Sequence, residues 1–175
     1  TSLPITRSFD NLFQARKVDL SHLMMARLYL EPTAAKHAAL YHAPSDIDNL
    51  TNLLDTADGL LEKSVREARL TNILFHVEIS RITKNPIMIF LSESITHVCS
   101  SVIIEMTEGR VSKETVKKLI NEHRRILKSI ADRDAAGTYK MSQKHLYDTY
   151  KVYLKMMPSL CEKSVKVQMS KLIGS

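Results

Sequence analysis

The chain has 175 residues, 44% of them hydrophobic, which is enough for a single domain with a real core. Two cysteines, Cys99 and Cys161, are too few for a disulfide framework, and their apolar helical contexts fit a reduced cytoplasm. No apolar run reaches about 18 residues and no signal peptide opens the chain, so we expect a soluble, cytoplasmic protein without a membrane partner.

The net charge of +6 raises the question of nucleic acid as a partner. The positive residues are scattered over predicted helix exteriors, as in the pairs Lys117-Lys118 and Arg124-Arg125. No glycine-rich loop, aromatic platform or Cys/His finger accompanies them. A solvated surface is therefore favoured over a nucleic-acid face, which stays open as the alternative.

The pattern of the whole chain predicts an all-α protein. Glycines and prolines are few, long stretches repeat at helical period, and β-branched runs at period two are absent. We expect an antiparallel bundle of about six to seven helices over residues 18–175. Residues 1–17 are expected to form a linker with a short helix over 10–17. The chain opens on Thr1 rather than methionine, which suggests a fragment or a processed product.

The first long helix is expected to begin near Val18, where apolar residues start to recur at helical spacing. Arg27 and Glu31 lie on this apolar stripe and should therefore point toward the core. A buried arginine needs a partner. That partner is either Glu31, in a structural pair, or a bound anion, since a guanidinium grips carboxylates through two hydrogen bonds. Pro32 should kink or interrupt the helix.

The middle of the chain reads as three helices. Ser45 is the expected N-cap of the first. Segments 65–83 and 86–106 are apolar on more than one side, which is typical of central helices. Asn85 should cap the last of the three, with Pro86 at its first position.

Asn72 and His76 share one face of the helix over 65–83, because they are four residues apart. His76 lies about 14 Å from the end of that helix, near its mid-height. Since this helix reads as central, both side chains should lie deep in the bundle.

The stretch 117–150 reads as two amphipathic helices joined by a turn near Asp132–Asp134. His123 and His145 lie inside the two apolar stripes, each 11 residues from Asp134. At about 1.5 Å per residue, both imidazoles are roughly 16 Å from the turn. If the helices pack antiparallel, the two imidazoles meet at the same height.

His76, His123, His145 and the amide oxygen of Asn72 can thus converge in the middle of the bundle. Neutral imidazole is the commonest zinc ligand, and a site with three nitrogen ligands leaves a position open for water or a carboxylate. The alternative is that each histidine is a hydrogen-bonded core residue without a ligand.

Several motifs, taken in order, resemble a known family. They are Arg27-Leu-Tyr-Leu-Glu31-Pro-Thr-Ala-Ala, Asn72-x3-His76 with Phe75, Asn85-Pro86, Glu122-His123-x2-Ile126-Leu127, and Asp134-x-Ala136-x4-Met141-x3-His145-Leu146. This order and spacing resembles the FCD effector-binding domain of the FadR-like branch of GntR transcription regulators, over roughly residues 18–155.

The resemblance implies a dimeric regulator whose N-terminal winged helix-turn-helix, which reads DNA, is absent from this chain. It implies a divalent metal held by an aspartate and three histidines, with a small carboxylate bound at the metal. The histidines carry over to His76, His123 and His145. Asn72 stands at the aspartate position, and an amide oxygen is a weaker donor than a carboxylate. The family's helix arginine carries over to Arg27, facing the effector.

We therefore expect an effector-sensing domain, not an enzyme, with Asn72, His76, His123 and His145 as metal ligands and Arg27 as an effector ligand. Zinc is the expected metal, with nickel and manganese as alternatives.

Two rival classes remain open. One is a metal-dependent hydrolase with a three-histidine site, and the other is a metal-free helical interaction domain. Against the enzyme, the sequence places no carboxylate beside the histidines, because Glu122 is about 100° around the helix from His123.

Overall fold

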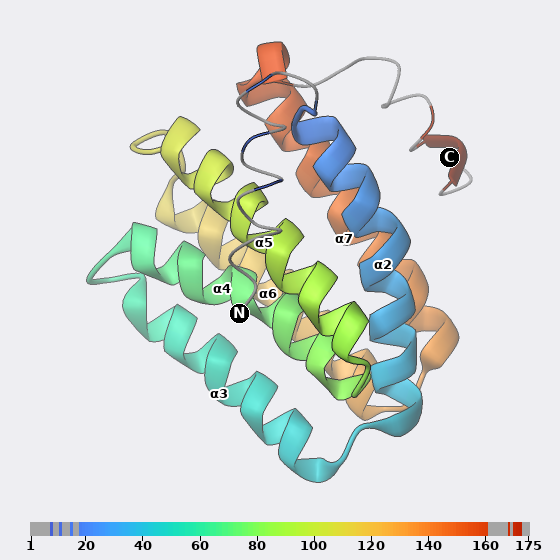
Figure 1. Ribbon diagram of the computed structural model, residues 1–175. Coiled ribbons are helices and arrows are strands. Elements are labelled where there is room, and N and C mark those ends of the chain that lie inside the picture. Colours follow the sequence, from blue (N-terminus) through green and yellow to red (C-terminus); the bar gives the residue numbers. More distant parts are fainter. Residues whose placement is uncertain are drawn as a thin grey trace.

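The computed structural model describes residues 18–160, together with residues 8, 11, 15, 168 and 170–172. Within these residues the chain forms helices and no strand, as Figure 1 shows, so the predicted all-α class is confirmed. The helices are α2 (Leu20–Tyr41), α3 (Pro44–Leu60), α4 (Val65–Ile82), α5 (Pro86–Met106), α6 (Lys113–Ala131), α7 (Ala135–Met156) and the 3-10 turn η1 (Pro158–Leu160). The short helix expected over 10–17 lies mostly outside the described residues, as does Cys161.

Pro32 does not interrupt α2, so of the two outcomes expected from sequence, a kink or an interruption, the interruption is wrong. A proline inside a helix removes one backbone hydrogen bond and costs about 3 kcal/mol. The residues on both sides of Pro32 are buried, including Leu28, Ala34, Ala35 and Ala38. Packing of both halves of the helix against the bundle outweighs the local cost.

The helix starts show which capping predictions hold. Asn85 accepts from the backbone N–H groups of Ile87 and Met88, which confirms it as the N-cap of α5. The prediction for α3 is wrong: Ala43 is the N-cap and Pro44 takes the first position. The Asp46 carboxylate accepts from the backbone N–H of Ala43 at 2.8 Å, while no side chain caps the first N–H groups of the helix itself. A proline at the first position has no N–H to satisfy, and the helix begins two residues earlier than expected.

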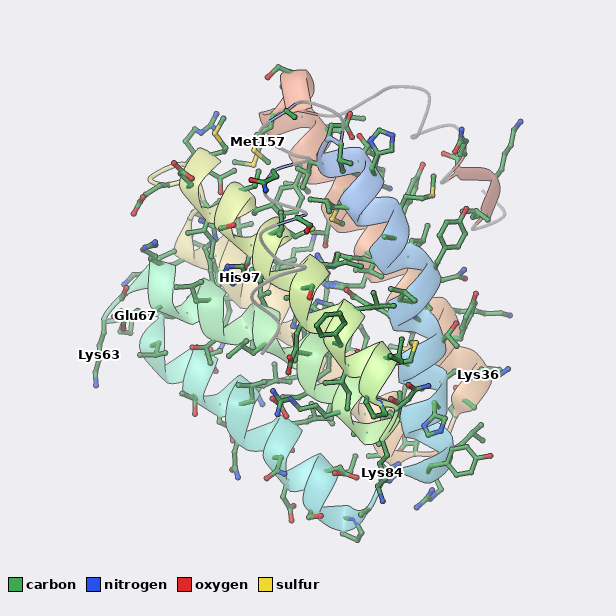
Figure 2. The ribbon with its side chains drawn as sticks, in the orientation of Figure 1. Lys36, Lys63, Glu67, Lys84, His97 and Met157 are labelled. Carbon is green, nitrogen blue, oxygen red and sulfur yellow. The ribbon has the colours of Figure 1, made fainter. Side chains whose placement is uncertain are left out.

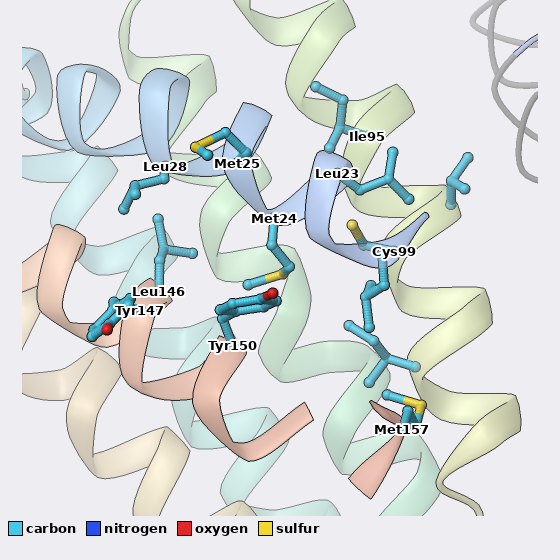
Figure 3. Close-up of a cluster of buried hydrophobic side chains, with 13 residues drawn as sticks. Leu23, Met24, Met25, Leu28, Ile95, Cys99, Leu146, Tyr147, Tyr150 and Met157 are labelled. Carbon is cyan, nitrogen blue, oxygen red and sulfur yellow. The ribbon is translucent and has the colours of Figure 1, made fainter. Parts of the chain in front are cut away.

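The core of the described residues contains three apolar clusters, and the two larger ones flank the site. The first joins α2, α5 and α7, and Figure 3 shows Met24 and Leu28 of α2 pointing toward Tyr150 and Leu146 of α7. The second joins α2, α3, α4 and α6 around Phe75. The inner faces of α4, α6 and α7 meet between the two clusters, and the polar residues singled out above lie there.

The expectation that α4 and α5 are central helices, buried on more than one side, holds only in part. Asn72 and His76 are buried on the inner face of α4. However, Leu70, Leu74 and Ile87 are exposed, so these helices present an apolar face outward. Periodicity shows that a face is apolar but not what covers it. Among the described residues α5 alone is long and apolar enough to cross a membrane, with a hydropathy of 1.7, yet its inner face is part of the core.

Candidate metal centre

Three helices bring three histidines together. His76 comes from α4, His123 from α6 and His145 from α7. Their exposed fractions are 6%, 2% and 7%, and each offers a ligand atom within 4.8 Å of the others. The Nε2 atoms of His123 and His145 are 2.9 Å apart.

The packing of α6 against α7 explains why His123 meets His145. The turn between the helices has Arg133 at a φ of 58°, and the Ser129 and Thr138 hydroxyls are 2.8 Å apart beyond it. His123 and His145 form a second contact between these two antiparallel helices, further from the turn, as their equal spacing from Asp134 predicts. Phe75 holds the ring of His123 by stacking on it, with the ring centroids 4.5 Å apart.

Each histidine has an oxygen atom at Nδ1. Glu31 Oε2 lies 2.9 Å from Nδ1 of His76, and Glu122 Oε2 lies 2.9 Å from Nδ1 of His145. Asn72 Oδ1 lies 2.8 Å from Nδ1 of His123. Such acceptors fix the ring orientation and leave Nε2 for a metal, as is common around histidine ligands.

Two predictions about acidic residues are corrected here. Glu122 was placed away from the histidines because it is about 100° around α6 from His123. It is adjacent to His145 instead, since α7 packs on that side of α6. Glu31 was seen only as a partner for Arg27, and its contact with His76 has no signal in the spacing of the sequence.

The electrostatics keep two of the imidazoles neutral. Burial lowers the pKa of His76 to about 4, although the Glu31 carboxylate opposes that shift. Burial also lowers the pKa of His123 well below its usual value. Burial would raise the pKa of Glu31, but Arg27 and His76 outweigh it and hold that pKa at about 2. The Nδ1–H of neutral His76 therefore donates to an ionised carboxylate.

Arg27 lies beside the histidines and is paired with Glu31, as the structural interpretation of the sequence anticipated. Its Nε donates to Oε1 of Glu31 at 2.6 Å, and Nη2 donates to Oε2 at 3.3 Å. The sulfur of Met24, 3.7 Å away, is a weak acceptor for Nη1. Arg27 thus keeps N–H groups for another acceptor without breaking its ion pair.

A cavity of about 30 Å³ adjoins the histidine cluster. Its lining includes Arg27, the three histidines, Asn72, Cys99, Thr149 and Tyr153, and no carboxylate of the described residues. The Thr149 hydroxyl is buried without a hydrogen-bond partner among those residues. Burial raises the pKa of Cys99 to about 12, so it stays a neutral thiol. Sequence reasoning found neither Cys99 nor Thr149 as lining residues.

The sequence-based argument against an enzyme is wrong, because two carboxylates accompany the histidines. Both are bound to Nδ1 atoms, however, and neither Glu31 nor Glu122 lines the cavity. Neither is placed to take a proton from water held at the Nε2 side.

A second, open pocket of about 280 Å³ lies on the other side of His145. Lys118, Arg125 and Lys144 line it together with the carboxylates of Glu122 and Asp148, and Lys144 is paired with Asp148. Elsewhere on α6 the cations are paired with α3, as in Lys117–Asp58 and Arg124–Asp55. Figure 2 shows Lys36, Lys63 and Lys84 pointing outward at the edges of the bundle. Much of the positive charge is therefore ion-paired or solvated surface.

Comparison with known proteins gives one match. The sequence model of the FCD domain matches residues 22–148, which contain every residue of the cluster described above. No curated protein matches the chain. No solved structure matches it either.

Proposed function

Because the chain belongs to the FCD domain family, we propose that it is the effector-sensing domain of a bacterial transcription regulator that holds a divalent metal and a small organic acid. The role as an effector-binding domain follows from the family, whose members are effector-binding domains of GntR-type regulators. The metal, the acid, the dimer and the DNA-binding arm are our proposal. DNA would be read by a winged helix-turn-helix segment of the full-length regulator.

The observation that carries the metal is the arrangement of the imidazoles. With oxygen at each Nδ1, the Nε2 atoms of His76, His123 and His145 are the nitrogens left for a ligand. Zinc binds nitrogen at about 2.0–2.1 Å in a tetrahedral arrangement, so two nitrogens on one ion lie roughly 3.3 Å apart. Two of the Nε2 atoms are 2.9 Å apart, so the two rings need to separate by only a few tenths of an ångström to share an ion. An all-nitrogen set favours zinc or nickel over manganese, which prefers oxygen ligands.

The acid is supported by polar groups that face the cavity. A bound metal offers an open position to a carboxylate. Arg27 keeps unused N–H groups beside it, and the Thr149 hydroxyl has no partner among the described residues. The Glu31 and Glu122 carboxylates make this region less cationic than three neutral histidines and a dipositive ion alone would be.

The size of the cavity implies that the acid changes the structure. About 30 Å³ admits water but no organic acid, since ligand pockets usually measure about 300–1,000 Å³. The acid must therefore displace side chains around the metal. His145 lines both this cavity and the larger pocket beside Lys118 and Arg125, through which the acid can enter. Binding that favours an expanded form shifts the population of the dimer.

The dimer has a candidate surface. Leu70 and Leu74 of α4 are 40% and 47% exposed and line a groove of about 570 Å³ between α4 and α5. We propose that a second copy of the chain covers this groove. A regulator that reads a two-fold DNA site needs such a partner.

Metal analysis tests the proposal. The purified 175-residue chain should bind about one zinc ion after treatment with a chelator and dialysis, as measured by calorimetry and elemental analysis. Alanine at His76, His123 or His145 should remove most of the bound metal, whereas His97→Ala, at an exposed histidine of α5, should retain it. If the chelator changes neither thermal stability nor the response to acids, the proposal is wrong and a metal-free bundle is favoured.

A further inference from the structure

The contacts of His123 and His145 restrict which of their ring nitrogens can carry a proton. A neutral imidazole carries one N–H, and Nδ1 of His145 must carry its proton to donate to the Glu122 carboxylate. If Nδ1 of His123 likewise donates to Asn72 Oδ1, both Nε2 atoms are bare. Two unprotonated Nε2 atoms 2.9 Å apart repel each other, because their lone pairs face each other. A cation between them removes the repulsion.

Asn72 offers a second solution. The two ends of an amide have nearly the same shape, and the structure gives this amide one hydrogen bond among the described residues, the one to His123. Rotation by half a turn puts Nδ2–H against Nδ1 of His123. The proton of His123 then moves to Nε2 and donates to Nε2 of His145. A continuous chain results, from Asn72 through His123 and His145 to Glu122, in which each imidazole N–H is matched to an acceptor.

We infer that Asn72 is a positioning residue and not a metal ligand, and that its amide selects the tautomer of His123. With a metal bound, Asn72 Oδ1 accepts from Nδ1–H and all three Nε2 atoms face the ion. Without metal, Asn72 donates and His123 carries its proton on Nε2. A carboxylate at this position could only accept, so it would permit the metal-bound pattern alone while His123 stays neutral.

The rival solution is a proton added to His145, which would then donate from both ring nitrogens. That adds a positive charge to the cluster, between the Glu122 carboxylate and the His123 ring, whereas rotation of the amide adds no charge. The two solutions differ in the tautomer of His123 and in the charge of His145. Both are visible to nitrogen NMR of the histidine rings.

The inference rests on the metal site proposed above. The experiment distinguishes failure of the inference about Asn72 from failure of the proposed metal site. Protein labelled with ¹⁵N in histidine is examined at neutral pH, free of metal and then saturated with zinc. We expect His123 to be the Nε2–H tautomer without metal and the Nδ1–H tautomer with it. If zinc binds and His123 is Nδ1–H in both states, with His145 cationic in the metal-free protein, the inference is overturned while the metal site stands. If no zinc binds, both fail.

Variants at Asn72 test the role as a positioning residue. Asn72→Leu, which can neither donate nor accept, should weaken zinc binding roughly 10- to 100-fold. The absorption spectrum of the cobalt-saturated variant should match that of the unmodified protein, because no ligand is lost. Asn72→Asp should bind zinc at least about 10-fold more tightly and keep His123 as Nδ1–H without metal. Asn121→Asp, at an exposed position on α6, controls for the added charge. A cobalt spectrum altered by Asn72→Leu would identify Asn72 as a ligand and overturn the inference.

Discussion

Glu31 of α2 accepts hydrogen bonds both from Arg27 and from Nδ1 of His76, at 2.6 Å and 2.9 Å. One buried carboxylate thus connects the arginine proposed to meet the effector with a histidine proposed to hold the metal. An anion that draws Arg27 away from Glu31 would change the hydrogen bond that orients His76. These contacts would provide a short physical route between the proposed effector and the proposed metal, through two side chains four residues apart and a third from another helix.

Replacement of Glu31 should be costly for stability. In Glu31→Gln, Arg27 remains buried without its counter-charge, and loss of one partner of a buried pair costs about 3–5 kcal/mol. Glu122→Gln should cost less, about 1 kcal/mol, since that side chain is 25% exposed and keeps a hydrogen-bonding amide. Chemical denaturation of the metal-free protein measures both. The double variant Arg27→Met, Glu31→Leu should recover much of the loss, and equal costs for Glu31→Gln and Glu122→Gln would contradict this account.

Stability of the metal-free protein should fall with acidification. Burial lowers the pKa of His76 from 6.5 to about 4, so between these values the unfolded chain binds a proton that the folded chain does not. The free energy of unfolding therefore decreases as pH drops from about 6.5 toward 4, with roughly 3 kcal/mol of the decrease due to His76. His123, whose pKa is also lowered, adds to the decrease. The pKa of Glu31, lowered from 4.5 to about 2, extends the loss below pH 4.5.

Urea denaturation at about pH 7, 6 and 5 checks this dependence. His76→Gln, which can still donate to Glu31, should flatten the slope, whereas His97→Gln, at an exposed histidine, should leave it unchanged. A free energy of unfolding that stays constant or rises as pH falls over this range would count against a buried, neutral His76.

Small acids should stabilise the zinc-loaded protein. A thermal-shift screen of mono- and dicarboxylic acids, sugar acids, neutral sugars and amines should give hits among the acids, because the open metal position and Arg27 both favour anions. At a hundred times its dissociation constant, a ligand stabilises the fold by about 2.7 kcal/mol. Arg27→Met and Thr149→Val should each weaken the response, and Thr51→Val, on α3 away from the cavity, should not. Hits confined to uncharged or cationic compounds would contradict the proposal that the site binds small acids.

The chain should form a dimer at micromolar concentration in sedimentation experiments. Leu74→Glu places a charge in the groove between α4 and α5 and should shift the protein toward monomer. Tyr41→Glu, at a residue 66% exposed at the end of α2, is the matched control and should remain dimeric. A monomeric parent protein, or a dimer that tolerates Leu74→Glu, would show that α4 and α5 do not form the interface.

The sequence by itself determined the fold class and the histidines of the site. Helical period fixes which residues of one helix share a face, and equal spacing from a turn fixes the height at which His123 and His145 meet. The burial of Arg27 follows from the same rule, and its pairing with Glu31, one turn away, is one of the two alternatives that the sequence left open. All of these are relationships within a helix or across a single tight turn.

Only the tertiary structure decided what surrounds those histidines. Glu31 reaches His76, and Glu122 reaches His145, because of how α2, α4, α6 and α7 are rotated about their axes as they pack. That rotation depends on the fit of whole helix faces, which no spacing along one helix encodes. The unbroken α2 at Pro32 has the same origin, since packing over the length of the helix outweighs a local preference.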